Sequence, residues 1–224
     1  MDINSHNNVL KGYNMLLYFA GSMIMFEPNE ECITDFWTKG IVKSLPVSSS
    51  NPTFLKAASQ LRNSCIDANF SGAAMHNDYL KLFSKNGTAL APAYESLYRN
   101  PNPSGKHNSD TATDFYRDYG WESKFKNKIS DDHLGIELLF LTLMVDKYTE
   151  LDDEACRREM KNEIKRFINK HIISWIPEWN KDVQAHAETL SFKGVGSLIV
   201  ACCEDILSLI SSEHEEPARK DFKN

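Results

Sequence analysis

The stretch that decides the fold of this chain is SDDHLGIELLFLTLMVDKYTE, residues 130–150. Apolar side chains recur along it every three or four residues, which is the spacing of one face of an α-helix. Further apolar residues cover most of the remaining faces, so we predict a helix that is buried in the core. Ser130 is expected to cap this central helix, with Asp131 and Asp132 in its first turn, where the helix dipole favours negative charge.

Helical periodicity also dominates the rest of the chain, and no stretch has a convincing strand pattern. The sequence therefore predicts an all-α, single-domain bundle of about ten helices. A capping Asn51 is expected before the helix that begins at Pro52, and Pro177 is expected to end the helix that precedes it. The helix that begins at Pro52 should bury a regular apolar stripe, formed by Phe54, Leu55, Ala58, Leu61, Cys65 and Ile66. Besides the central helix, we expect helices over residues 9–26, 30–43, 52–66, 73–83, 114–121, 154–176 and 195–211.

The chain, residues 1–224, is predicted to be one helical domain with a polar segment near its middle. Residues 100–113 are rich in Asn, Pro, Ser, Gly and Asp, and we expect them to form a hinge loop between the halves 1–99 and 114–212. Neither half has a surplus of apolar residues, so the halves should share one core. The charged tail, residues 213–224, is expected to be disordered.

Composition argues against several classes of protein. The net charge of −6 is unfavourable for binding the phosphates of nucleic acids. The five cysteines include no C-x-x-C pair, which favours reduced thiols in a cytoplasmic protein. The uncharged run 12–26 is interpreted as a core helix and not as a signal peptide. Neither it nor residues 138–145 reaches the ~20 apolar residues of a membrane span, so no membrane insertion is expected.

Three polar residues stand out at the start of the central helix. Asp132 and His133 lie in its first turn, and Glu137 follows His133 by one turn on the same face. We interpret them as an exposed acidic, hydrogen-bonding rim that receives a basic or polar group of a ligand. The alternative is that they act only as helix caps and as a local His–Glu pair.

A second group of candidate residues lies in the predicted helix 154–176. His171 and Trp175 are four residues apart and share one helix face. Trp combines a large apolar area with one hydrogen-bond donor, which suits the wall of a binding site. The alternative is that both are ordinary core residues. The aromatic-rich stretch 94–121 has the same two interpretations, a wall of a groove for an apolar peptide or core packing near the hinge.

The chain has no motif of a metal site or of a nucleophilic enzyme. It contains neither His-Glu-x-x-His nor Gly-x-Ser-x-Gly, so we expect no metal and no catalytic residue. Asp132, His133 and His171 nevertheless carry suitable atoms. A metal- or nucleotide-dependent helical hydrolase built on these three residues is therefore the alternative function, and a plain scaffold without a peptide groove is a third.

Several segments, taken in order, resemble the motifs of one protein family. They are FEP at residues 26–28 followed by two glutamates, YLKLF at 79–83 followed by Gly87, PAYESLY at 92–98, YG at 119–120, DHLGIEL at 132–138, and Phe-x-x-x-His-x-x-x-Trp-x-Pro over 167–177. Together they resemble the TorD/DmsD family of cytoplasmic molybdoenzyme maturation chaperones, which is related to the NarJ-type chaperones. The chain departs from the family pattern at Asp131, where relatives usually have proline, and at Arg99-Asn100.

The resemblance implies an all-α fold, a monomer or a domain-swapped homodimer, and no catalytic chemistry or cofactor. The implied partners are the twin-arginine signal peptide and the apo-form of the catalytic subunit of a molybdoenzyme. Tyr98, Asp132 and His133 match family positions linked to signal-peptide binding, and His171 and Trp175 match further motif positions.

These implications lead to an expected binding mode. The apolar body of the signal is expected to dock as a helix in a groove lined by Tyr94, Leu97 and Tyr98. Asp132 and Glu137 would then meet its arginines.

Overall fold

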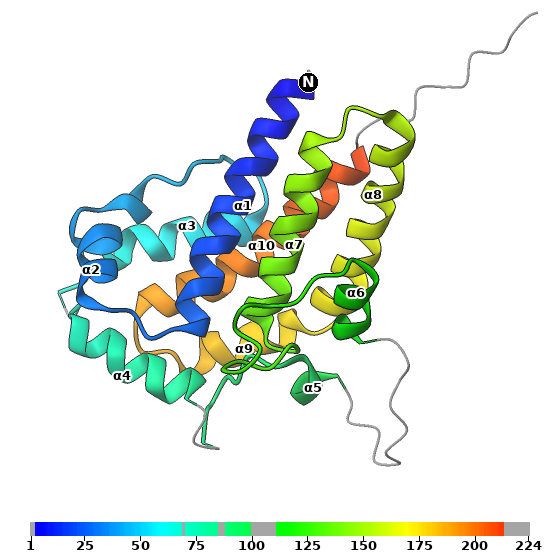
Figure 1. Ribbon diagram of the computed structural model, residues 1–224. Helices are drawn as coiled ribbons and strands as arrows, with labels where there is room; N and C mark the ends of the chain where they lie inside the picture. Colours follow the sequence, from blue (N-terminus) through cyan, green and yellow to red (C-terminus); the bar gives the residue numbers. More distant parts are fainter. Residues whose placement is uncertain (1–2, 69, 85–87, 100–110, 213–224) are drawn as a thin grey trace, which may run out of the picture.

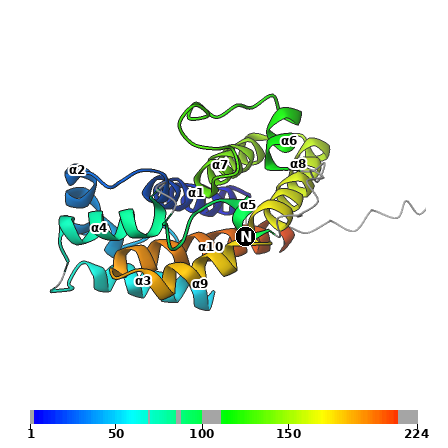
Figure 2. The same cartoon turned by 90° about the horizontal axis from the view of Figure 1, so that it is seen from below.

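The long helix α10 (Leu190–Ser212) lies at the centre of the computed structural model, which describes residues 3–68, 70–84, 88–99 and 111–212 (Figure 1). Helix α10 packs against α3 (Pro52–Ser64), α1 (Ile3–Met25) and α9 (Ile176–His186). Seen from below, α3, α9 and α10 form one layer, and α1 and α7 (Leu134–Glu150) lie over it (Figure 2). The remaining helices are α2 (Glu30–Ile33), α4 (Gly72–Phe83), α5 (Glu95–Tyr98), α6 (Ala112–Asp118) and α8 (Glu154–Phe167).

The all-α prediction is confirmed, since the described residues form ten α-helices and no strand. The buried central helix is also confirmed as α7, because most of its side chains are shielded from water. Helices α3 and α10 come from the two different predicted halves of the chain, yet they pack along each other. The described parts of the two predicted halves therefore share one core. The predicted hinge falls mostly, and the predicted tail entirely, outside the described residues.

Helix α7 approaches α1 closely because both helices carry glycine at the crossing. Gly21 lies opposite Leu138 and Gly135, and Gly135 lies directly beneath Met25. A β-carbon on Gly135 would overlap the side chain of Met25, so only glycine fits there without movement of that side chain or of α1. This crossing fixes the position of the N-terminal end of α7.

Two predicted helices are interrupted in the structure. The helix expected over 30–43 is interrupted at Gly40, whose φ of 78° is left-handed and favours glycine. The helix expected over 154–176 gives way to a π-helical turn at Ile168–Ile172, and Pro177 lies in the first turn of α9 instead of ending a helix. Proline is tolerated there because the first turn needs no intrahelical N–H donor.

Two side chains predicted to be buried in α3 and the residues that follow it are exposed. The stripe expected from Phe54 to Ile66 is correct for Phe54 and Leu61, whereas Leu55 and Ile66 face water. Ala57 and Ser64 are buried instead, and the Ser64 hydroxyl accepts a hydrogen bond from the Trp37 ring nitrogen at 2.9 Å. The buried face of α3 is thus rotated relative to the prediction.

Helix α10 is long and apolar enough to cross a membrane, and no other helix in the described part of the chain is. Two thirds of its most apolar window, 67%, is nevertheless buried against the rest of the protein. The length and the apolar character of α10 are therefore explained by its position in the core of the bundle.

Candidate functional site

The segment that contains Tyr94 is joined to the N-terminal end of α7 by backbone hydrogen bonds. The N–H of Leu134 donates to the carbonyl of Ala93 at 2.8 Å, and the N–H of Glu95 donates to the carbonyl of Asp132 at 2.9 Å. These bonds place Tyr94 and His133 side by side, with ring centroids 5.0 Å apart and rings nearly perpendicular. Two motif segments that are distant in the sequence therefore form one structural unit.

His133, and not Ser130, caps α7. Its Nδ1 accepts a hydrogen bond of 3.0 Å from the N–H of Gly135, and the helix begins at Leu134. The prediction that Ser130 caps the helix, with two aspartates in the first turn, is therefore wrong by three residues. The Ser130 hydroxyl instead donates to the carboxylate of Asp132 at 2.5 Å.

Tyr94 and His133 line a cavity of about 180 Å³ between the ends of α1 and α4. Most of the other residues that line it have apolar or aromatic side chains. The hydroxyl of Tyr79 crosses from α4 to α1 and donates to the carbonyl of Met25 at 3.2 Å, which ties the two walls together. The lining residues are Ile24, Met25, Tyr79, Leu80, Phe83, Ser84, Tyr94, Ile129 and His133.

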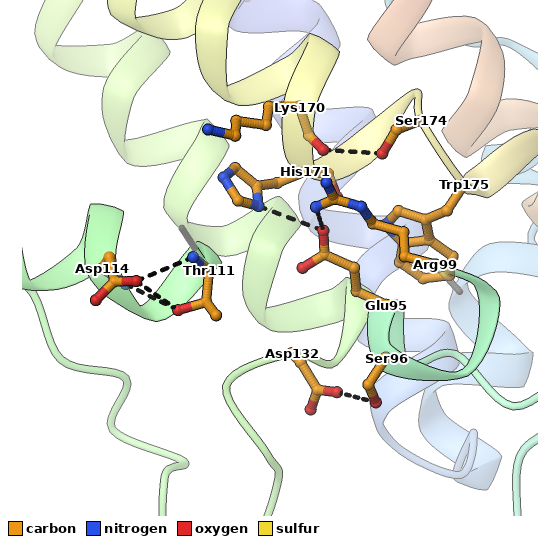
Figure 3. A network of polar contacts seen from close by, with 10 residues as sticks. All are labelled: Glu95, Ser96, Arg99, Thr111, Asp114, Asp132, Lys170, His171, Ser174 and Trp175. Carbon is orange, nitrogen blue, oxygen red and sulfur yellow. Dashed lines mark hydrogen bonds and ion pairs between the residues drawn. The ribbon is translucent and has the colours of Figure 1, made fainter. Parts of the chain in front are cut away.

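Asp132 provides a fixed negative charge beside this cavity. Its partly exposed carboxylate accepts hydrogen bonds from Ser130 and from Ser96, the latter at 2.5 Å (Figure 3). Burial raises the pKa of Tyr94, and the negative charge of Asp132 raises it further. The two serine hydroxyls hold the carboxylate in place without neutralising it.

Tyr98 and Leu97 do not join Tyr94 at this cavity. The ring of Tyr98 stacks on Trp175, with centroids 5.5 Å apart, and its hydroxyl donates to Asp182 at 2.9 Å. Burial and the hydrogen bond to Asp182 raise the pKa of Tyr98. Leu97 is 59% exposed. These contacts therefore do not form the continuous groove lining that we expected from Tyr94, Leu97 and Tyr98.

Trp175 and His171 are buried and contact residues of α5, Tyr98 and Glu95 respectively. The ring N–H of Trp175 donates to the carbonyl of His171 at 2.6 Å. The Nδ1 of His171 lies 3.3 Å from a carboxylate oxygen of Glu95, and the same oxygen pairs with the guanidinium of Arg99 (Figure 3). Glu95 thus sits between a histidine and an arginine at the start of α5.

Glu137 is fully buried, with 0% exposure, and the prediction that it forms part of an exposed rim is wrong. His133 is also buried, so Asp132 is the one member of that predicted rim that is open to solvent. Neither carboxyl oxygen of Glu137 has a hydrogen-bond partner of good geometry. Burial, followed by the charges of Glu95 and Asp132, raises the pKa of Glu137 well above its ordinary value.

The described residues give little support to hydrolytic chemistry. Among them, no group of three or more His, Cys, Asp and Glu side chains is arranged to hold a metal ion. Of the three residues of the alternative hydrolase, His133 caps α7, Asp132 bonds to two serines and His171 faces Glu95. Each of these side chains thus has its own structural contact, and these contacts do not join the three residues.

Sequence reasoning missed Glu95 and Arg99, and also the part played by α4. Glu95 lies inside the PAYESLY segment, but a single glutamate gives no sign of burial. The signal that could have found the cavity is YLKLF at 79–83, whose Tyr79 and Phe83 share a helix face and line it.

Residues 50–181, more than half of the chain, match the family described as the nitrate reductase delta subunit. The chain belongs to the nitrate reductase delta subunit family. The matched stretch runs from α3 into α9 and includes every residue predicted for the site. The family membership expected from the motifs is thus confirmed.

Two curated relatives of this delta-subunit family member are named Chaperone protein TorD. The relative from Vibrio parahaemolyticus is 28% identical over 141 residues, which cover 62% of this chain and 65% of the relative, just under two thirds of its length. The relative from Photobacterium profundum is 24% identical over 209 residues, covering 88% of this chain and 94% of the relative. Both relatives are named as chaperones and not as enzymes, in agreement with the prediction of a protein without catalytic chemistry.

Proposed function

We propose that this protein is a cytoplasmic chaperone for a molybdenum-containing oxidoreductase subunit. It binds the twin-arginine signal peptide and the apo-form of that subunit, and holds the subunit for cofactor insertion before export. The proposal is supported by the family membership and by the names of the two relatives. The single observation that carries it is the apolar cavity of Tyr94 and His133 beside the fixed charge of Asp132.

A twin-arginine signal has a cationic head followed by an apolar, helix-prone body. The cavity of about 180 Å³ has room for an apolar side chain of that body. Burying a leucine or phenylalanine contributes ~1.5–3 kcal/mol. Leu80 at the cavity and Phe26 next to Met25 are exposed apolar side chains that extend the contact surface.

The arginines meet the carboxylate of Asp132. A charge-assisted hydrogen bond in a partly dry site contributes ~1.5–3 kcal/mol, whereas an exposed ion pair contributes less than ~1 kcal/mol. A micromolar complex requires ~8 kcal/mol, so the apolar contacts must supply most of the affinity and the charge adds selectivity for arginine. Release requires only that a competing state of the signal becomes more favourable, and no nucleotide hydrolysis is needed.

The experiment compares Asp132→Asn with Asp131→Asn as a matched control. Both variants remove one negative charge, but the Asp131 side chain has no contact with Ser96 or Ser130 among the described hydrogen bonds. The probe is a synthetic peptide with two adjacent arginines and an apolar body, titrated by calorimetry at low salt. We expect Asp132→Asn to weaken binding by ~10-fold or more and Asp131→Asn by much less.

A second peptide, with both arginines replaced by glutamine, should bind wild type weakly and be insensitive to Asp132→Asn. Thermal melts of each variant exclude a general loss of structure. Equal affinity of the two aspartate variants would remove Asp132 from the site, and no binding of the arginine peptide by wild type would overturn the proposed function.

A further inference from the structure

A buried acidic cluster lies behind the proposed peptide site and is covered by one arginine. Glu95 begins α5, and its side chain is only 8% exposed. It pairs with Arg99, which follows α5 and whose side chain is 36% exposed (Figure 3). The guanidinium therefore closes the cluster from the solvent side.

Glu137 approaches the same cluster from α7, and its carboxyl group makes no hydrogen bond of regular geometry with the described residues. Both of its oxygens are shielded from water and have no hydrogen-bond partner of good geometry. Glu95 and the ring of Trp175 are its neighbours. Buried carboxyl groups are normally hydrogen-bonded, so an orphan of this kind requires an explanation. A guanidinium bound in the cluster would supply donors to Glu137 and would release to solvent the proton that this buried carboxyl group holds in the free protein.

A guanidinium is the group that fits two adjacent carboxyl groups. It is planar, stays charged and carries five N–H donors, so it can serve two acceptors at once. Arg99 meets Glu95 from only one helical turn away, and its described contact is to Glu95 alone. A guanidinium that is not tethered to α5 is free to approach Glu137 as well.

We propose that Glu95 and Glu137 form a binding site for one arginine of the partner's signal, and that Arg99 occupies this site in the free protein. This inference rests on the proposed function, because the ligand is the arginine pair of the signal. Binding then exchanges one guanidinium for another. The signal arginine that takes the site must displace Arg99, so Arg99 lowers the affinity and reserves the site for a guanidinium.

The test is Arg99→Ala, with Arg117→Ala as the matched control. Arg117 is also close to one acidic partner, Asp114, on a short helix, but its ion pair is with Asp114 and not with Glu95, and its side chain is mostly exposed. We expect Arg99→Ala to bind the diarginine peptide ~10-fold more tightly than wild type, whereas Arg117→Ala changes the affinity little. The diglutamine peptide should gain nothing. A diarginine affinity that rises no more in Arg99→Ala than in Arg117→Ala would overturn the inference.

A second readout does not depend on the signal peptide. N-acetyl-arginine amide should raise the melting temperature of Arg99→Ala but not of wild type, and the lysine analogue should have a smaller effect. Adding Glu95→Gln should abolish the rise. If arginine amide stabilises Arg99→Ala while no peptide binds, the guanidinium site stands and the proposed function fails. If the peptide binds and arginine amide has no effect, only the inference fails.

Should Arg99→Ala fold poorly, Arg99→Lys serves in its place. Lysine keeps the charge near Glu95 but cannot form the forked contact of a guanidinium. We expect a smaller gain in affinity for the diarginine peptide, still above that of Arg117→Lys. An unchanged affinity would contradict the displacement of Arg99.

Discussion

Gly135→Ala is the substitution that tests most sharply how the helix crossing supports the site. A β-carbon at this position would overlap Cγ of Met25, and would lie 2.7 Å from its sulfur and 3.1 Å from the carbonyl oxygen of Gly21. The sulfur belongs to a flexible side chain, but the carbonyl moves only if α1 moves. Overpacking of this kind destabilises by ~1–3 kcal/mol, against which the higher helix propensity of alanine offsets up to ~1 kcal/mol.

We therefore expect a net loss of about 1–2 kcal/mol in the free energy of unfolding, measured by urea titration. Gly72→Ala is the control, because its β-carbon would meet only Ile33 at an ordinary 3.4 Å, and it should be neutral or stabilising. The double variant Gly135→Ala/Met25→Ala should lose less than the sum of the two single variants, since the smaller residue 25 makes room.

The same substitution should also weaken peptide binding, because the N–H of Gly135 holds the ring of His133. A Gly135→Ala protein that is as stable as wild type would show that the crossing of α1 and α7 is not closely packed. Strict additivity in the double variant would refute the assignment of the strain to Met25.

Two further predictions concern buried carboxyl groups. Asp78 on α4 accepts hydrogen bonds from the N–H groups of Glu188 and Thr189 and from the Thr189 hydroxyl, just before α10 begins. Asp78→Ala should therefore lower the free energy of unfolding, measured in urea, by about 3 kcal/mol. A loss below about 1 kcal/mol would contradict this role of Asp78. Burial, with the charges of Glu95 and Asp132, holds the pKa of Glu137 above its ordinary value of 4.5, so the folded protein keeps a proton that the unfolded chain releases. The contribution of Glu137 to stability should therefore fall as the pH rises above about 4.5, and Glu137→Gln should lessen that fall. Identical pH profiles of the two proteins would disprove the shifted pKa.

The core was largely predictable because its helices carry strong, regular apolar patterns. The buried helix α7 follows from its nearly uniform apolar faces, and the motif order identified the family. Helix boundaries were less predictable where one residue decides them. Gly40 breaks one predicted helix through its left-handed backbone, and the cap of α7 is a histidine, a residue that helix-capping preferences do not favour.

The site was predicted in its members but not in its arrangement. Spacing placed His133 and Glu137 on one face of α7, but could not show that this face turns inward. The single helical turn of α5 sends Tyr94 and Tyr98 to different neighbours, His133 and Trp175. That separation depends on tertiary hydrogen bonds between distant segments, which no local pattern encodes.

The most direct measurement is photo-crosslinking from the signal peptide to the protein. A diarginine peptide with a photoreactive group in its apolar body is mixed with wild-type protein, irradiated, digested and analysed by mass spectrometry. We expect adducts on residues that line the cavity, Tyr79, Phe83 and Tyr94 above all, and we expect these adducts to disappear when unlabelled peptide competes. Adducts confined to the outer faces of α3 and α8, or adducts that the competitor does not reduce, would contradict this expectation.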